Sequence, residues 1–183
     1  MKPVKFTEMK YGTKEEYLSL APRWEKVTQQ VPKQLLYALE QLKKSYEGFQ
    51  IDRYEHSLQT ATRAYRGGED KDMVVASLFH DIGDFLAPYN HGEMAAAILK
   101  PYVSQKTHWI IKHHDVFQKY YYVHHFDGNR YEREQYKDSV YYQDTINFSE
   151  NYDQNSLDPN YDSLPLEFFV PIVKEVFEQP QSY

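Results

Sequence analysis

Apolar residues recur along most of the chain at the spacing of one face of an α-helix. The clearest stripe lies between residues 33 and 44, where the spacing of four leucines puts them on one side of a helix: Leu35, Leu36, Leu39 and Leu42. The alternation of apolar and polar residues that is typical of half-buried strands is scarce. We see no internal repeat, low-complexity linker or domain boundary. The pattern therefore predicts an all-α protein, with residues 1–183 forming a single compact helical bundle.

Residues that begin or end helices divide the chain further. Pro22 and Pro32 are each expected in the first turn of a helix, where proline is tolerated. Asp52, three residues before Glu55, predicts an N-cap similar to a capping box, and Asp70 predicts another N-cap. The predicted helices cover residues 23–30, 33–44, 52–66, 70–82, 92–99, 105–119, 131–142 and 164–177.

The composition of the chain excludes several kinds of metal site and several classes of protein. The chain has eight histidines and no cysteine, which excludes disulfides, thiolate metal sites and a cysteine nucleophile, so any metal must be held by His, Asp or Glu. A net charge of −6 argues against a nucleic-acid surface, because such surfaces neutralise phosphates with Lys and Arg. No apolar stretch approaches the roughly 18 to 20 residues of a membrane helix, and the first ten residues lack a secretory signal. We expect a soluble, cytoplasmic protein.

Histidine and aspartate residues fall at the ends and on the faces of these predicted helices. His80 and Asp81 end an apolar helix, and His56 lies 24 residues earlier on the preceding one. A turn around residues 67 and 68 would make the two helices antiparallel and bring the imidazoles together. A His-Asp pair alone is weak evidence, because a single buried histidine is often only a hydrogen-bonded core residue.

Three further candidates strengthen the prediction of a metal site. His91 opens the next helix, and Asp153 follows a later one. His113 and His114 are adjacent, so they point about 100° apart on a helix and only one can face a shared site. We take His114, with His113 as the alternative. Four imidazoles and two carboxylates suit a pair of iron-like ions, and Asp81 is the natural bridge because His80 beside it already binds one of them.

These residues resemble the H…HD…D signature of the HD-domain superfamily, and His91 and His114 resemble the additional ligands of its two-metal branch. The chain is similar there to the mixed-valent diiron oxygenases that cleave phosphonates and, more distantly, to myo-inositol oxygenase. Residues 54–61 are similar to the E-H-x-L-Q-x-A segment of the phosphonate enzymes, 111–114 to the I-R-x-H step of both groups, and 148–153 to the F-x-x-Y-D segment of inositol oxygenase. The similarity covers about residues 46–153, the expected metal-binding core.

The resemblance implies two iron ions, Fe(II) and Fe(III), that use dioxygen to cleave a C-C or C-P bond of a small hydroxylated substrate. It assigns one iron to His56, His80 and Asp153 and the other to His91 and His114. Asp81 would bridge the two ions. Tyr46 resembles the lid tyrosine of the phosphonate enzymes, which occupies an iron site until substrate displaces it.

The substrate-binding positions depart from the family pattern. Asp84 replaces a His or Lys, Glu150 replaces an Arg, Gln118 replaces a Lys although Lys119 is adjacent, and Phe49 replaces a glutamate. Phosphonates are held by charge-assisted bonds from basic groups. We therefore expect a substrate that is neutral or cationic at its far end, with Asp84 and Glu150 as the candidate contacts.

Two other functions remain open. A phosphohydrolase acting on a nucleotide or phosphomonoester would use the same ligands to hold Mn, Zn or Fe, with a bridging hydroxide as nucleophile. A binding protein without turnover is less favoured, because six ligating groups exceed what a structural site requires. The tyrosine-rich residues 120–142 could wall the pocket or form a homodimer contact, although packing around the terminal helix is the favoured role.

Overall fold

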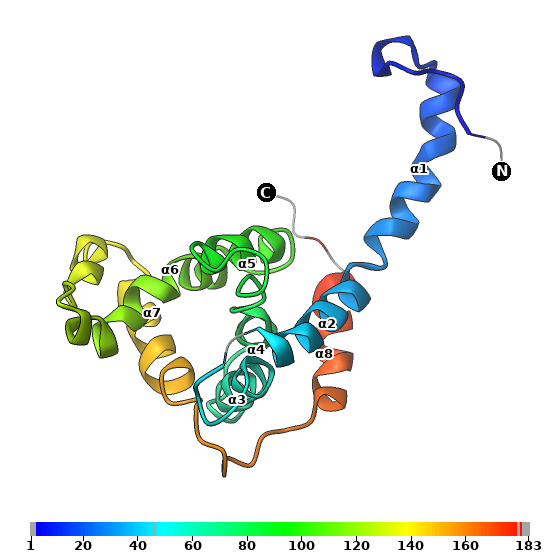
Figure 1. Ribbon diagram of the computed structural model, residues 1–183. Helices are drawn as coiled ribbons and strands as arrows, with labels where there is room; N and C mark the ends of the chain where they lie inside the picture. The colour runs from blue at the N-terminus through cyan, green and yellow to red at the C-terminus, as the bar shows by residue number, and fades with distance from the viewer. Residues whose placement is uncertain (1–2, 46, 179, 181–183) are drawn as a thin grey trace.

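The computed structural model describes residues 3–45, 47–178 and 180, and within these ranges the only regular secondary structure is helical (Figure 1). The prediction of an all-α protein is confirmed. The elements are η1 (Met9–Tyr11), α1 (Lys14–Thr28), α2 (Val31–Gln41), η2 (Leu42–Lys44), α3 (Arg53–Arg66), α4 (Lys71–Phe79), α5 (His91–Leu99), α6 (Gln105–Tyr122), η3 (Val123–Phe126), η4 (Glu132–Tyr136), α7 (Tyr142–Phe148), the π-helix η5 (Ser149–Asp153) and α8 (Leu166–Glu178).

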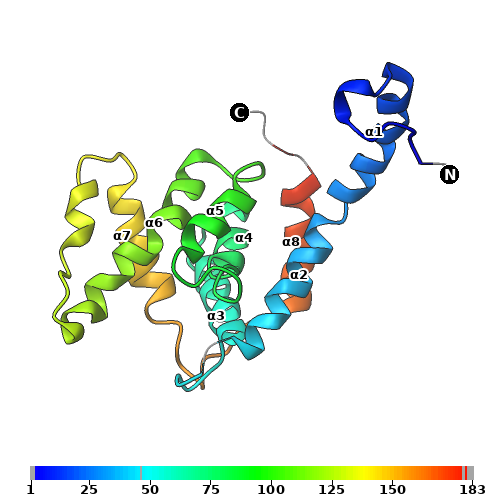
Figure 2. The ribbon, with the colours of Figure 1, turned by 45° about the horizontal axis from the view of Figure 1, so that its top comes forward.

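Helices α3 and α4 form the centre of the molecule. They pack against each other, with α2 and α8 side by side on one flank and α6 and α7 on the other (Figures 1 and 2). Nine of the fourteen residues of α3 are buried, and so are seven of the nine residues of α4. His56 on α3, and His80 and Asp81 directly after α4, are therefore held within the buried core.

Both predicted aspartate N-caps are confirmed. The backbone N–H of Glu55 donates to Asp52 Oδ1 at 2.8 Å at the start of α3, and that of Met73 donates to Asp70 Oδ1 at 2.9 Å at the start of α4. Each cap satisfies a backbone donor that has no partner within the helix. The capped ends fix where the two central helices begin.

The first helix begins nine residues earlier than predicted. A capping box between Thr13 and Glu16 opens α1 at Lys14, and Pro22 lies inside the helix, so its expected place in a first turn is wrong. Pro32 does lie in the first turn of α2. Helix α1 contains no buried residue and extends away from the other helices in both views (Figures 1 and 2). A proline there disturbs only a solvated backbone.

The predicted helix over residues 131–142 is also wrong. The chain forms only the short 3₁₀ helix η4, then a turn, and α7 begins at Tyr142. The Tyr136 ring packs 5.4 Å from Trp109 and 6.1 Å from Phe117, and Trp109 Nε1 donates to Ser139 Oγ at 2.6 Å. Packing of this segment against α6 overrides its helical pattern.

None of the helices in the described part of the chain combines the length and the apolar character that a membrane span requires.

Candidate metal centre

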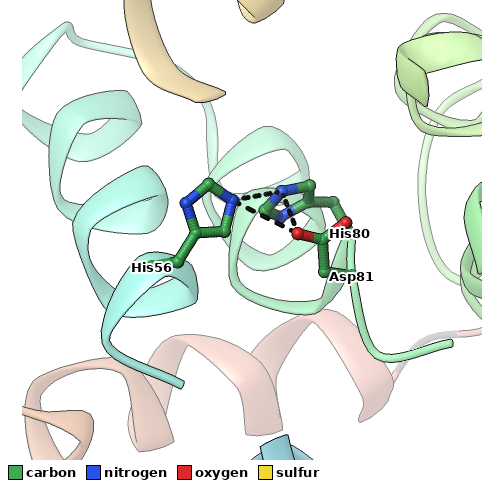
Figure 3. A group of neighbouring side chains, drawn as sticks. All are labelled: His56, His80 and Asp81. Carbon is green, nitrogen blue, oxygen red and sulfur yellow. Dashed lines mark hydrogen bonds and ion pairs between the residues drawn. The ribbon is translucent and has the colours of Figure 1, made fainter. Parts of the chain in front are cut away.

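Three of the candidate ligands meet where α3 passes the end of α4. His56 lies on α3, and His80 and Asp81 follow the last residue of α4. The Nε2 atoms of His56 and His80 are 3.2 Å apart, and they lie 3.2 and 3.1 Å from Asp81 Oδ2. Figure 3 shows the two imidazoles and the carboxylate turned toward one another. All three side chains are buried, so the polar atoms face a shared point inside the core.

Asp153 reaches this point from the π-helix η5. Its Oδ1 lies 3.3 Å from His56 Nε2 and 3.5 Å from His80 Nε2. Gln118 Nε2 donates to the same oxygen at 2.9 Å. The second oxygen, Oδ2, is buried without a hydrogen-bond partner among the residues that the structure describes. A buried carboxylate oxygen without a partner is costly, and a bound cation would satisfy it.

The remaining two imidazoles approach the other oxygen of Asp81. Nε2 of His91, the first residue of α5, lies 3.4 Å from Asp81 Oδ1, and Nε2 of His114 on α6 lies 3.3 Å from it. His113 points elsewhere, because its Nδ1 contacts the Trp109 carbonyl at 2.8 Å and its ring packs on the Trp109 side chain. Two imidazoles therefore face each oxygen of one carboxylate.

Backbone carbonyls orient three of the four imidazoles. The Nδ1 atoms of His56, His80 and His114 contact the carbonyl oxygens of Ser156, Ser77 and Ile111 at 2.8, 2.7 and 2.6 Å. A neutral imidazole that donates through Nδ1 has its lone pair on Nε2, the atom that faces the site. Such outer contacts are the usual support of metal-binding histidines.

The electrostatics of the protein alone show how much negative charge the site concentrates. Burial opposes ionisation of Asp81, but Arg53 and His80 hold the pKa of this carboxyl well below its usual range. Burial likewise opposes ionisation of Asp153, and hydrogen bonds from His56 and His80 hold its pKa low. Burial also disfavours a charged His80, yet Asp81 and Asp153 raise its pKa to about 10. The negative charges of Asp81 and Asp153 that favour a protonated His80 would equally favour a bound metal cation.

Arg53 is a member of the site that the sequence reasoning missed. Its Nη2 donates to Asp81 Oδ2 and its Nε donates to Asp84 Oδ2 at 2.8 Å. Only 12% of its side chain is exposed. Arg53 precedes His56 by three residues on a helix, a spacing that puts both on one face, and this was the signal available in the sequence.

The predicted substrate contacts are only partly gathered at the site. Gln118 contacts the cluster of candidate ligands through its hydrogen bond to Asp153. Asp84 contacts it through His91 and is paired with Arg53. The ammonium of Lys119 instead pairs with Glu132 at 3.1 Å, and Glu150 is exposed. Tyr46, the predicted lid residue, lies outside the described residues.

The donor set fits metal ions. Three groups have ligand atoms that all lie within 4.8 Å of one another: His56 with His80 and Asp81, His80 with His114 and Asp153, and Asp81 with His91 and His114. Imidazole and carboxylate together suit iron, manganese or zinc. The buried cluster can therefore hold one or more metal ions.

Comparison with known proteins identifies the fold family. The sequence model of the HD domain matches residues 53–145, about half of the 183 residues. No curated protein is significantly similar to the chain. The matched region contains His56, the adjacent His80 and Asp81, His91 and His114, and it ends before Asp153. The chain therefore belongs to the HD domain family, whose domains bind divalent metals and which indicates a metal-dependent enzyme.

Proposed function

We propose that this protein is a non-heme diiron oxygenase that uses dioxygen to cleave a C-C or C-P bond of a small hydroxylated substrate. The observation that carries the proposal is the division of four imidazoles between the two oxygens of Asp81. A carboxylate approached in this way can bridge two cations, and two imidazoles for each ion suit iron.

In this proposal His56, His80 and Asp153 would hold one ion, His91 and His114 would hold the other, and Asp81 would contribute to both. The iron pair, when bound, supplies the one-electron chemistry that activation of dioxygen requires. The backbone carbonyls behind the histidines keep their Nε2 atoms directed inward. Gln118 fixes one oxygen of Asp153 by donating from its amide.

Asp84 does not stand at the site as a free carboxylate. Asp84 was expected to attract a neutral or cationic group, but one of its oxygens accepts from Arg53 at 2.8 Å. Arg53 also donates to Asp81, so its single positive charge is shared between two carboxylates. Glu150 is exposed and unaffected by this pairing. The test therefore needs substrates of each charge.

Anaerobic reconstitution of the metal-free protein with Fe(II) tests the proposal. After partial oxidation, EPR should detect a coupled Fe(II)/Fe(III) pair, and its signal should change when a hydroxylated substrate binds. A panel of small alcohols carrying an anionic, neutral or cationic end group should contain a compound that stimulates oxygen uptake. Asp81→Asn should lose both the signal and the uptake, whereas His113→Ala should keep them.

A metal-dependent phosphohydrolase is the second candidate, and Arg53 is the observation that favours it. A buried guanidinium directed at the proposed bridging carboxylate has further N–H groups that could bind phosphate oxygens by charge-assisted bonds. The same ligands would then hold Mn or Zn, and an activated water would be the nucleophile.

The two candidates differ in what they consume. Phosphate release from nucleotides or phosphomonoesters with Mn(II) or Zn(II), without oxygen uptake in the iron-loaded protein, would replace the oxygenase proposal by the hydrolase. Arg53→Lys should then raise KM, because a lysine cannot make the bidentate contact of a guanidinium.

A further inference from the structure

His91 is the least constrained of the four histidines. Its side chain is 19% exposed, whereas those of His56, His80 and His114 are fully buried. Its Nδ1 lies 3.5 Å from the nearest backbone carbonyl, that of Pro88, a distance at the outer limit of a hydrogen bond. The other three have carbonyl contacts of 2.6 to 2.8 Å. Backbone alone therefore does not fix the His91 ring.

A carboxylate stands at the same nitrogen. Asp84 Oδ1 lies at the same distance of 3.5 Å from His91 Nδ1, but a carboxylate attracts a ring N–H more strongly than a neutral carbonyl does. The other oxygen of Asp84 accepts from Arg53 Nε at 2.8 Å. Arg53 in turn donates through Nη2 to Asp81 Oδ2, and Asp81 Oδ1 faces His91 Nε2 at 3.4 Å. The four side chains close a ring in which two carboxylates alternate with an imidazole and a guanidinium.

We infer that Asp84 is a positioning residue that orients His91, and that the two metal positions of the site consequently differ in affinity. The ion held by His56, His80 and Asp153 binds to a preformed set of donors. The ion held by His91 and His114, here called the second ion, binds more weakly, because His91 is partly exposed and has no short backbone contact at Nδ1. The inference rests on the dinuclear site of the proposed function, but not on the reaction performed there.

The ring also gives Arg53 a role in this arrangement. Because Arg53 holds Oδ2 of Asp84, it helps to determine how Oδ1 is presented to His91 Nδ1. Asp84 and Arg53 side chains are 15% and 12% exposed, so their pairing is screened little by solvent. Outer-shell partners of this kind typically contribute about 10- to 100-fold to metal affinity.

Titration of the metal-free, full-length protein with Mn(II), followed by calorimetry and by elemental analysis of the bound metal, tests the inference. The wild type should bind two ions with different affinities. Asp84→Ala should lower the affinity for the second ion about 10- to 100-fold and leave the affinity for the first ion within about twofold of the wild type. Asp84→Asn keeps an acceptor oxygen and should give a smaller loss, and it serves as the readout if the alanine variant does not fold.

Two further variants make the result specific. Glu93→Gln removes an exposed carboxylate two residues from His91 and should leave both affinities within about twofold. His91→Ala should abolish the second ion only. Unchanged binding in the Asp84 variants, or an equal loss at both positions, would overturn the inference. A wild type that binds one ion would overturn it together with the dinuclear site, whereas two ions without oxygen uptake would leave it standing and reject the oxygenase alone.

Discussion

The backbone of Gly83 lies against that of His91. A Cβ atom added to Gly83 would lie 2.6 Å from the Cα of His91 and 2.7 Å from its carbonyl oxygen. These contacts are with backbone, so the start of α5 would have to move. A glycine at this position lets the turn after Asp81 approach the helix that carries His91.

We therefore expect Gly83→Ala to displace His91 and to lower the affinity for the second metal ion. Overpacking of this kind destabilises a protein by about 1–3 kcal/mol. Calorimetric metal titration and urea unfolding measure the two effects. Gly92→Ala serves as a milder comparison. Its Cβ would lie 3.1 Å from His114 ring atoms and from the Ile111 carbonyl, so its loss of stability and of metal affinity should be smaller. Wild-type binding of both ions by Gly83→Ala would contradict this account.

Removal of the Arg53 guanidinium should lower the free energy of unfolding most when no metal is bound. Arg53→Met leaves the buried carboxylate of Asp81 without its cation, which costs about 3–5 kcal/mol in comparable buried pairs. Bound metal ions would neutralise the same carboxylate, so the loss should shrink after metal loading. Urea unfolding of both forms measures it. Arg66→Met, which breaks an exposed pair with Asp162, should cost under about 1 kcal/mol in either form. Equal losses for Arg53→Met with and without metal would be the contrary result.

Tyr152 should contribute a pH-dependent part of the stability in alkaline solution. Burial and a 2.9 Å hydrogen bond from its hydroxyl to Glu69 raise the pKa of Tyr152 to about 12. In the unfolded chain a tyrosine ionises near pH 10. The unfolded state therefore loses its proton first, so the contribution is complete below about pH 10 and disappears as the pH rises through 12.

The difference in unfolding free energy between the wild type and Tyr152→Phe isolates this effect from the other tyrosines. It should stay constant up to about pH 10 and then fall. Denaturant unfolding at a series of pH values between 8 and 12 measures it. Parallel stability curves for the two proteins over that range would refute the prediction.

Adjacent histidines on α6 should differ completely in their effect on metal binding. His114→Ala removes an imidazole that faces Asp81 at 3.3 Å, so the protein should lose the second ion. His113→Ala removes a ring that packs on Trp109, so both ions should bind as in the wild type. Elemental analysis of the purified variants after metal loading distinguishes them. Loss of metal in the His113 variant would require a different ligand set.

The sequence alone determined the features that depend on neighbouring residues. Helical periodicity identified the all-α class, and the caps at Asp52 and Asp70 follow from hydrogen bonds to an N–H three residues away. The adjacent His80 and Asp81, with His56 before them, identified the family, because their spacing along the chain is itself the motif.

Long-range contacts decided the rest. The pairing of Arg53 with Asp84 joins residues 31 apart in sequence, and no local pattern specifies it. Tertiary packing against Trp109 replaced the helix expected at residues 131–142 by a short 3₁₀ turn. The division of the histidines between the two oxygens of Asp81 depends on how α3, α4, α5 and α6 meet. The sequence could name the candidate ligands because their chemistry is local, but only the packed helices determine which oxygen of Asp81 each imidazole faces.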